Sequence, residues 1–468
     1  MRAAAFSNDF FLPDRDAAAY VPPIEARCRR LVLFGFSRRT FFSLILALLM
    51  AGFGAPLPAG AQAPPSAGGS RPSAAASSED TADPNRLYER GADYEQGRKG
   101  RTKDEREAAR LYRLGAEKNH PKAQVALGIF YMEGRGGLPK DERQAEHFWR
   151  LAAEQGEAGG QTGLGFLYAM GRGGLTKDDR EAVRFYRLAA DQGNAKGQYN
   201  LASYYEQGAG GIAKDDAEAA RLYRLAADQG LGTAQAALAR MYVEGRGGLA
   251  KDEKEAARLL RLAAEQGDVR AEANLASFYE EGRGGLPKDE AEATRLFRLA
   301  ADQGFAPAQA KLGVFYALGG GGLAKDESEA ARLFRLAAEQ GHPLAQYNLG
   351  FLYETGAGGL PKDEQQAARL FRLAADQGLA AAQTELGVFY VEGRGGLAKD
   401  EREGARLLRL AAEQGYANAQ YDLGFLYETG AGGLQKDLHE AVRLYRLAAE
   451  QGDVDARAAL DRLGAPAK

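Results

Sequence analysis

The sequence predicts an all-α protein, a solenoid of ten helix–turn–helix repeats of 37 residues each over residues 85–456. Three observations support this fold class. A tyrosine recurs at an unbroken spacing of 37 residues, apolar residues recur at helical spacing within each unit, and a glycine-rich loop divides each unit in two. Such a period marks stacked units that cannot bury their apolar faces alone, so we expect one continuous array. The tyrosine column consists of Tyr94, Tyr131, Tyr168, Tyr205, Tyr242, Tyr279, Tyr316, Tyr353, Tyr390 and Tyr427.

The chain before the repeats has the features of an export signal. Arg38 and Arg39 precede an apolar run over 41–53, and a small-residue site follows at 59–61. This order of features is typical of a secretory signal peptide, so we predict that residues 1–61 are an N-terminal extension and signal peptide. The apolar run is shorter than the ~20 residues that a membrane-spanning helix needs. The paired arginines also resemble a twin-arginine signal, so the export route stays open. We expect a periplasmic or secreted protein whose mature form has no membrane span.

Two segments flank the array. Residues 62–84 are rich in Pro, Ser, Ala and Gly and poor in large apolar side chains, so we predict a disordered tether. Residues 457–468 follow the tenth unit and are predicted to form a capping segment over its exposed end.

The first helix of a unit is illustrated by the eighth unit, where it is predicted over residues 343–355. At 100° per residue, Ala345, Leu349, Leu352 and Tyr353 share one face, which we assign to the core. Gly350 lies beside that face. Because a glycine inside a helix costs up to ~1 kcal/mol, we expect it to allow a close approach by a neighbouring helix.

A loop over 356–362 leads into the second helix of the unit. Its glycines permit positive φ, and Asp363 is predicted to cap the second helix together with the Glu or Gln three residues later, a capping box repeated in all ten units. The helix is expected to stop at Gly378. Its arginines, such as Arg369 and Arg372, are predicted to form a solvated outer face and to pair with acids four residues further on.

Composition excludes several classes of binding site. A formal net charge of −3 gives no basic footprint for nucleic acid. Cys28 is the only cysteine and precedes the predicted cleavage site, so no disulfide, thiolate metal site or cysteine nucleophile is expected in the exported form. The histidines are not spaced as metal ligands, and His120 and His342 are predicted to be exposed loop residues. We expect no metal and no other cofactor.

The sequence also offers no catalytic motif. The glycine-rich loops lack the Gly-Lys-Ser/Thr order and the preceding strand of a phosphate-binding loop, so they are interpreted as turns. The serines of the array, Ser203, Ser277 and Ser328, are not followed by a lysine three residues later. An enzyme is therefore not expected.

The pattern Ala-Gln-x-x-Leu-Gly-x-x-Tyr-x-x-Gly-x-Gly-Gly-Leu-x-Lys-Asp, followed by Ala-Ala-x-x-Gly at the end of the unit, stands cleanly at 345–378 and 419–452. It closely resembles the Sel-one-like repeat, a relative of the tetratricopeptide repeat. The resemblance implies a right-handed α/α superhelix whose first helices line the concave side. It also implies an adaptor for protein complexes, and exported bacterial members are implicated in envelope signalling or host contact. The first unit departs from the pattern at Leu87 and Arg90, as expected for a terminal cap.

The side chains opposite the core face of the first helix vary between units while the core columns do not. We predict that they form an aromatic, acid-edged ribbon that binds an extended peptide or a partner helix. The alternative is that they are peripheral core covered by the adjacent helix. The candidate partner-binding residues are Phe166, Tyr199, Arg240, Tyr347, Phe351, Glu354, Tyr421, Phe425 and Glu428.

The predicted function is a non-enzymatic adaptor that binds a protein or peptide partner on the concave face of the solenoid in the cell envelope, as a monomer. One alternative is a secreted factor that engages a host or foreign protein. A remote alternative is an enzyme that interacts with β-lactams, as some cysteine-rich relatives do.

Overall fold

A computed structural model describes residues 83–465 of the chain, and within this range the fold is all-α, with 21 helices and no strand. Each unit is a hairpin of two 13-residue helices, which we call helix A and helix B. A final helix, α22, stands where the helix A of a further unit would follow. The predicted solenoid of ten helix–turn–helix repeats is confirmed.

The A helices are α2 (Pro84–Gln96), α4 (Pro121–Glu133), α6 (Ala158–Met170), α8 (Ala195–Gln207), α10 (Gly232–Glu244), α12 (Val269–Glu281), α14 (Ala306–Leu318), α16 (Pro343–Thr355), α18 (Ala380–Glu392) and α20 (Ala417–Thr429), followed by α22 (Val454–Arg462). The B helices are α3 (Glu105–Glu117), α5 (Glu142–Glu154), α7 (Asp179–Asp191), α9 (Asp216–Asp228), α11 (Glu253–Glu265), α13 (Glu290–Asp302), α15 (Glu327–Glu339), α17 (Glu364–Asp376), α19 (Glu401–Glu413) and α21 (Leu438–Glu450).

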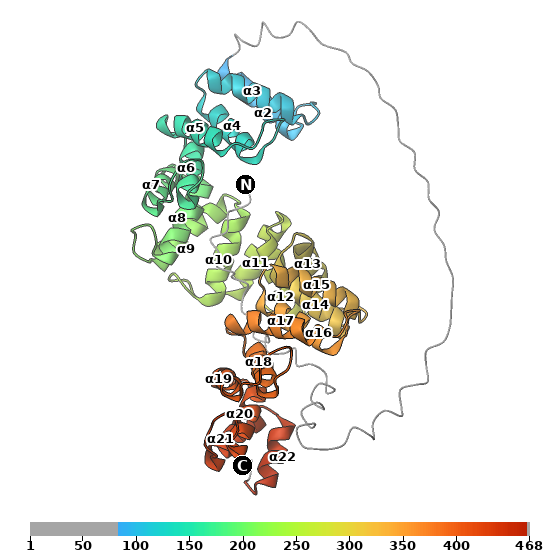
Figure 1. Ribbon diagram of the computed structural model, residues 1–468. Helices are drawn as coiled ribbons and strands as arrows, with labels where there is room; N and C mark the ends of the chain where they lie inside the picture. Colours follow the sequence, from blue (N-terminus) through green and yellow to red (C-terminus); the bar gives the residue numbers. More distant parts are fainter. Residues whose placement is uncertain (1–82, 466–468) are drawn as a thin grey trace, which may run out of the picture.

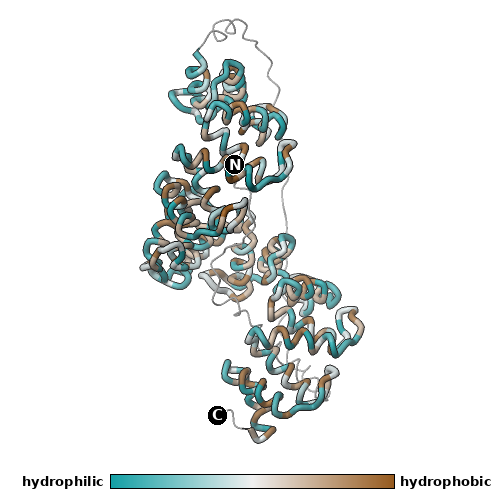
Figure 2. The backbone as a smooth tube through the Cα atoms, turned by 90° about the vertical axis from the view of Figure 1, so that its left-hand side faces the viewer, coloured by the Kyte–Doolittle hydropathy of each residue, from teal (hydrophilic) through white to brown (hydrophobic). Residues whose placement is uncertain are grey.

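The helices stack in chain order into a curved array (Figure 1). Each helix packs on the next, and contacts also join the A helices of neighbouring units, such as α4 with α6 and α18 with α20. In the upper part of Figure 1, α7 and α9 lie on the outer edge of the curve, while α6, α8 and α10 lie on its inner side. Hydrophobic and hydrophilic segments alternate along the whole array in Figure 2, because every hairpin contributes one apolar face to a continuous core.

The array differs slightly from its predicted limits. Pro84 already belongs to α2, so the helical part begins one residue inside the predicted tether. The capping helix α22 begins at Val454, three residues before the predicted capping segment. Residues 62–82 of the predicted tether and the predicted signal peptide lie outside the described residues. Within the described range, no helix has the length and apolar character needed to cross a membrane.

The core of a unit is formed by both helices. In the eighth unit Leu349 and Leu352 are each 4% exposed and share a buried cluster with Phe334 of the preceding helix B, while Phe371 of the unit's own helix B is fully buried in the next cluster. A Cβ added to Gly350 would lie 2.8 Å from the Phe371 ring, so this glycine makes room for an aromatic side chain. Helix B therefore comes close to Gly350 through the Phe371 side chain, and not through the close backbone packing that we expected. Tyr353, predicted to be core, is only partly buried.

One backbone hydrogen bond closes the loop of every unit. Helix A of the eighth unit ends at Gly356, whose φ of 73° is left-handed. The N–H of Asp363 then donates to the carbonyl of Tyr353 at 2.8 Å, and the same bond occurs in all ten units. This explains the constant separation between the tyrosine position and the capping aspartate, because the carbonyl at that position anchors the start of helix B.

The same bond changes the predicted helix cap. The Asp363 carboxylate accepts hydrogen bonds from the backbone N–H groups of Gln365 and Gln366, as expected. The predicted reciprocal bond, from the Asp363 N–H to the side chain three residues later, was wrong, because this N–H donates to the Tyr353 carbonyl. The acid at the third helical position is therefore free to pair elsewhere. In the ninth unit Glu403 binds Arg406 at 2.6 Å, an arginine three residues later. Arg372, for which Asp376 was the expected partner, donates to the Tyr390 hydroxyl at 2.8 Å.

Candidate functional site

All nine predicted partner-binding residues lie on A helices, on α6, α8, α10, α16 and α20. Burial divides them into two groups. Tyr347 is 1% exposed, with its ring 5.8 Å from that of Phe371, and Glu354 is 7% exposed and bound by Arg394 at 2.9 Å. These two side chains fit the peripheral-core interpretation, because a partner cannot reach them without a rearrangement.

The other aromatic candidates are half-buried. Phe351 packs against a buried cluster that includes Tyr347 and Phe371, and Phe425 of the tenth unit is also half-buried. Phe166 packs against the cluster around Trp149. Each of these phenylalanines therefore has one side within the core and another open to solvent. Such a side chain can anchor a partner at a smaller entropic cost than a fully mobile one.

The two tyrosines, Tyr199 and Tyr421, are half-buried in the same way. The ring of Tyr199 lies 5.6 Å from that of Tyr223, and the ring of Tyr421 lies 5.5 Å from that of Tyr445. Both partners are on the B helix of the same unit. The equivalent tyrosine of the eighth unit, Tyr347, is the one that is buried completely.

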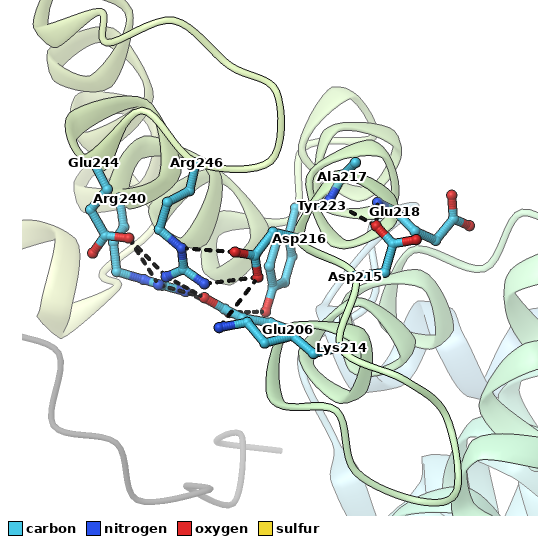
Figure 3. Close-up of polar contacts among 10 residues, drawn as sticks. All are labelled: Glu206, Lys214, Asp215, Asp216, Ala217, Glu218, Tyr223, Arg240, Glu244 and Arg246. Carbon is cyan, nitrogen blue, oxygen red and sulfur yellow. Dashed lines mark hydrogen bonds and ion pairs between the residues drawn. The ribbon is translucent and has the colours of Figure 1, made fainter.

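Arg240 belongs to a charged network between the fourth and fifth units (Figure 3). Its guanidinium donates two hydrogen bonds to Glu206, at 2.6 and 2.7 Å. The Tyr223 hydroxyl also donates to Glu206, at 3.1 Å. Burial alone would raise the pKa of Glu206, but Arg240 and Arg246 outweigh it and hold this pKa below its usual range. Arg240 therefore joins two repeats and is not free to bind a partner.

Glu428 repeats this arrangement at the C-terminal end. It accepts a hydrogen bond from the Tyr445 hydroxyl at 2.8 Å and pairs with Arg462 of α22. Arg462 lies six repeat lengths after Arg240 and therefore occupies the equivalent position in its helix. The capping helix thus uses the contact that joins internal units.

The loop arginines are a functional feature that sequence reasoning missed. In six units the residue after the glycine that ends helix A is an arginine, and in the five of these that follow another unit it binds the first residue of helix B in the preceding unit. The signal available in the sequence was an acid 30 residues before each arginine. These loop-arginine pairs are Arg135–Glu105, Arg172–Glu142, Arg246–Asp216, Arg283–Glu253 and Arg394–Glu364.

A second repeating contact, which we call the amide ladder, joins helices through glutamine side chains. A glutamine in helix A accepts a hydrogen bond from the glutamine that follows helix B of the same unit, 31 residues later. Gln309 and Gln340, for example, lie 2.9 Å apart. The helix A glutamine is at most 6% exposed in every pair of this kind. The hydrogen bond between the two amides holds the two helices of the hairpin together. The pairs are Gln124–Gln155, Gln161–Gln192, Gln198–Gln229, Gln235–Gln266, Gln309–Gln340, Gln346–Gln377, Gln383–Gln414 and Gln420–Gln451.

The prediction that His120 and His342 are exposed loop residues was wrong. Both are half-buried and cap A helices, because their Nδ1 atoms accept hydrogen bonds from the N–H groups of Ala123 and Ala345, at 3.1 and 3.4 Å. Burial is the main cause of a lowered pKa at His120. Over residues 83–465 the structure contains no group of three or more His, Cys, Asp or Glu side chains that could hold a metal ion.

The outer side of the array has a shallow groove and a column of exposed leucines. The groove, with a volume of about 460 Å³, lies between α7 and α9 over α8 and is lined by Arg187, Tyr205 and Leu225 among others. Leu225 is 40% exposed, and five equivalent leucines on other B helices are similarly open. These five are Leu188, Leu299, Leu336, Leu373 and Leu410.

Fold and contacts together define a helical-repeat solenoid, a type of protein–protein interaction scaffold. Ten consecutive matches to the Sel1 repeat model cover residues 87–120, 121–157, 158–194, 195–231, 232–268, 269–305, 306–342, 343–379, 380–416 and 417–453. The chain belongs to the Sel1 repeat family, as the sequence resemblance implied.

A solved structure agrees with this assignment. The chain is similar to c5321, a protective antigen present in uropathogenic Escherichia coli strains, with 33% identity, a TM-score of 0.58 and coverage of 84% of this chain and 83% of that chain. It is also similar to a Sel1 repeat protein from Oxalobacter formigenes, with 32% identity, a TM-score of 0.46 and coverage of 54% of this chain and 96% of that one. No curated protein matches the chain.

Proposed function

We propose that this chain is a non-enzymatic adaptor of the cell envelope that binds a protein or peptide partner on the inner, A-helix face of the solenoid. The observation that carries the proposal is the contrast between two kinds of column on the same helices. The amide ladder and the buried leucines scarcely change between units. The column of Phe351, by contrast, contains phenylalanine, serine, arginine, valine and isoleucine in other units.

Packing explains the constant columns but does not require a particular residue at the variable one. Phe351 and Phe425 are half-buried, so the variable column is partly open to solvent in these units, whereas Ser277 in the same column is buried and Arg240 is bound to Glu206. A surface of fixed shape with differing side chains from unit to unit suits an extended partner that is read along the array. Aromatic anchors favour a peptide or protein over a highly charged polymer.

The serine hydroxyls of the array support a role without catalysis. Ser277 is 8% exposed and donates to the Ala273 carbonyl on its own helix at 3.3 Å. The Ser203 hydroxyl oxygen accepts from Gln207, also on its own helix, at 2.9 Å. Nucleophilic catalysis would require a general base beside the hydroxyl, and both contacts are instead local to a helix.

A secreted factor that engages a foreign protein is the second candidate. It is supported by the similarity to c5321, which is described as a protective antigen of uropathogenic strains. Both candidates use the same inner face and differ in location. Fractionation of cells that express the full chain into periplasm and culture supernatant distinguishes them.

Site-specific photo-crosslinking tests the binding face. A photoreactive phenylalanine analogue is placed at Phe351 on α16 or, as a matched control, at Leu373, which is 43% exposed on helix B of the same unit, α17. We expect crosslinked protein from position 351 in the native envelope, weakened by Phe425→Ala, and none from position 373. Crosslinks from position 373 alone would move the binding site to the outer face and contradict the proposal.

A further inference from the structure

The amide ladder has a second bond that links neighbouring units. In five units the Nε2 atom of the helix A glutamine donates to the backbone carbonyl eight residues earlier, at the end of the preceding helix B. Gln309, for example, donates to the Ala301 carbonyl at 3.1 Å while its Oε1 accepts from Gln340 at 2.9 Å. The amide thus needs both a donor and an acceptor to complete its two contacts.

The sixth unit has a carboxylic acid in this position. Glu272 is 5% exposed and accepts a hydrogen bond from the Nε2 atom of Gln303 at 2.7 Å, in the manner of the glutamines. The backbone carbonyl eight residues before Glu272, equivalent to the one that the glutamines of five other units bind, belongs to Ala264 at the end of α11. An ionised carboxylate has no hydrogen to donate, so it leaves this contact between the fifth and sixth units unmade.

The charged groups around Glu272 do not neutralise it fully. On α13 the Arg295 cation favours the ionised form of Glu272, and Gln303, which follows α13, is a neutral donor. On its own helix lies Asp268, which caps α12 by accepting from the Ala271 N–H at 2.9 Å. Burial, followed by the Asp268 charge, raises the pKa of Glu272. The group that α11 contributes is a backbone carbonyl, which repels an ionised carboxylate and attracts a protonated one.

We propose that Glu272 makes the joint between the fifth and sixth units sensitive to pH. Protonation supplies the missing hydrogen, which bonds the Ala264 carbonyl, and the joint then has the same two contacts as its neighbours. Loss of the proton removes that bond and places two oxygens opposite each other. A group of this kind stabilises the fold below its unfolded pKa, and the stabilisation is lost as the pH rises through the higher folded value.

The direction of the effect separates this device from ordinary acid unfolding. Paired carboxylates such as Glu364 stabilise the array at neutral pH and lose that effect in acid. Glu272 does the opposite, because acid completes its contacts. This joint is therefore looser at neutral or higher pH than in acid, and acidification strengthens the connection between the fifth and sixth units.

Two reciprocal variants of the full chain test the proposal. Glu272→Gln supplies the permanent donor found in other units, and Gln309→Glu introduces a carboxyl at the equivalent position of the seventh unit. Hydrogen exchange of peptides from α11 to α13 is compared between variants at each pH from 4 to 8, alongside thermal unfolding. We expect amides of α12 in Glu272→Gln to exchange about fivefold more slowly than wild type at pH 8, the effect of one added hydrogen bond, and at the same rate at pH 4.

Gln309→Glu should show the converse in α14, with faster exchange than wild type at pH 8 and recovery on acidification. Asp268→Asn serves as a further control, because asparagine also caps a helix but does not titrate. A difference between Glu272→Gln and wild type that stays constant from pH 4 to 8 would overturn the proposal. A pH dependence of the exchange rate that disappears in Asp268→Asn and persists in Glu272→Gln would also overturn the proposal. If Gln309→Glu does not fold, the Glu272→Gln comparison decides alone.

Discussion

Arg394 and Glu364 lie 30 residues apart in sequence, and their side chains meet at 2.9 Å across the joint between the eighth and ninth units. The same guanidinium binds Glu354 of the eighth unit at 2.9 Å and lies over the Phe389 ring, 4.4 Å from its centroid. One loop residue therefore contacts both helices of the preceding unit and the core of its own. Four other joints have an equivalent loop arginine.

Replacement of this arginine should weaken the joint. Arg394→Met keeps the apolar stem but leaves Glu354, whose side chain is 9% exposed, without its cation, so we expect a loss of about 2 kcal/mol in the free energy of unfolding. Urea titration measures it. The Arg394 guanidinium holds the pKa of Glu364 down at about 2, so this stabilisation is present above the unfolded pKa of about 4.3 and is lost as the pH falls towards 2. A difference in the free energy of unfolding between Arg394→Met and wild type that did not narrow over this pH range would contradict the assigned pairing of Arg394 with Glu364.

A loop arginine can be added where the chain lacks one. At the joint between the seventh and eighth units the loop position holds Ala357, and Glu327 stands 30 residues earlier. We expect Ala357→Arg to raise the free energy of unfolding by about 0.5–1 kcal/mol, as for a partly exposed ion pair. Ala209→Arg is the matched control, because its acid, Asp179, already accepts from the Tyr204 hydroxyl at 2.9 Å. Equal gains in the free energy of unfolding at both positions, measured by urea titration, would show that the acid 30 residues earlier is not the cause.

The glycine in helix A should be replaceable only if the facing ring is reduced. Gly350→Ala places a methyl group 2.8 Å from the Phe371 ring, and such overpacking costs about 1–3 kcal/mol. The double variant Gly350→Ala, Phe371→Leu reproduces the pair of Ala239 and Leu260 found in the fifth unit, so it should recover part of the loss. A double-mutant cycle by chemical denaturation measures the coupling. Strict additivity of the two changes would argue against direct contact.

The inner phenylalanines should contribute little to stability if they form part of the binding face. Phe351→Ala and Phe425→Ala remove half-buried rings, so we expect each to cost about 1–2 kcal/mol, below the ~3–5 kcal/mol of a fully buried phenylalanine. Phe371→Ala, at a fully buried ring, is the reference for the larger value. Losses at Phe351 as large as at Phe371 would favour the peripheral-core interpretation and remove the basis of the inner binding face.

The sequence was sufficient for the fold because the repeat appears ten times. Helix A of the eighth unit was predicted over 343–355 and spans those residues in the structure. Each column could be compared over ten units, so apolar spacing, loop glycines and the capping aspartate all pointed to one hairpin. The Sel1 repeat matches cover the same array.

The candidate site was harder to predict because helical periodicity does not show what a neighbouring unit covers. Tyr347 and Tyr421 occupy the same column, yet only Tyr347 is fully buried. The role of the acids was missed for a related reason. Glu354 was interpreted as the edge of a binding ribbon, but its cation comes from a loop 40 residues later, and a single-helix projection does not include that loop.

The hydrogen bond from the Asp363 N–H to the Tyr353 carbonyl has an evolutionary consequence, because its counterpart closes an eleven-residue segment in every unit. An added or lost residue within that segment would displace the start of helix B and misalign every contact to the next hairpin. Recombination between two units at equivalent positions, by contrast, preserves all of these bonds. The gene can therefore lengthen or shorten the protein only in whole modules, which fixes the reach of its inner face to multiples of one hairpin.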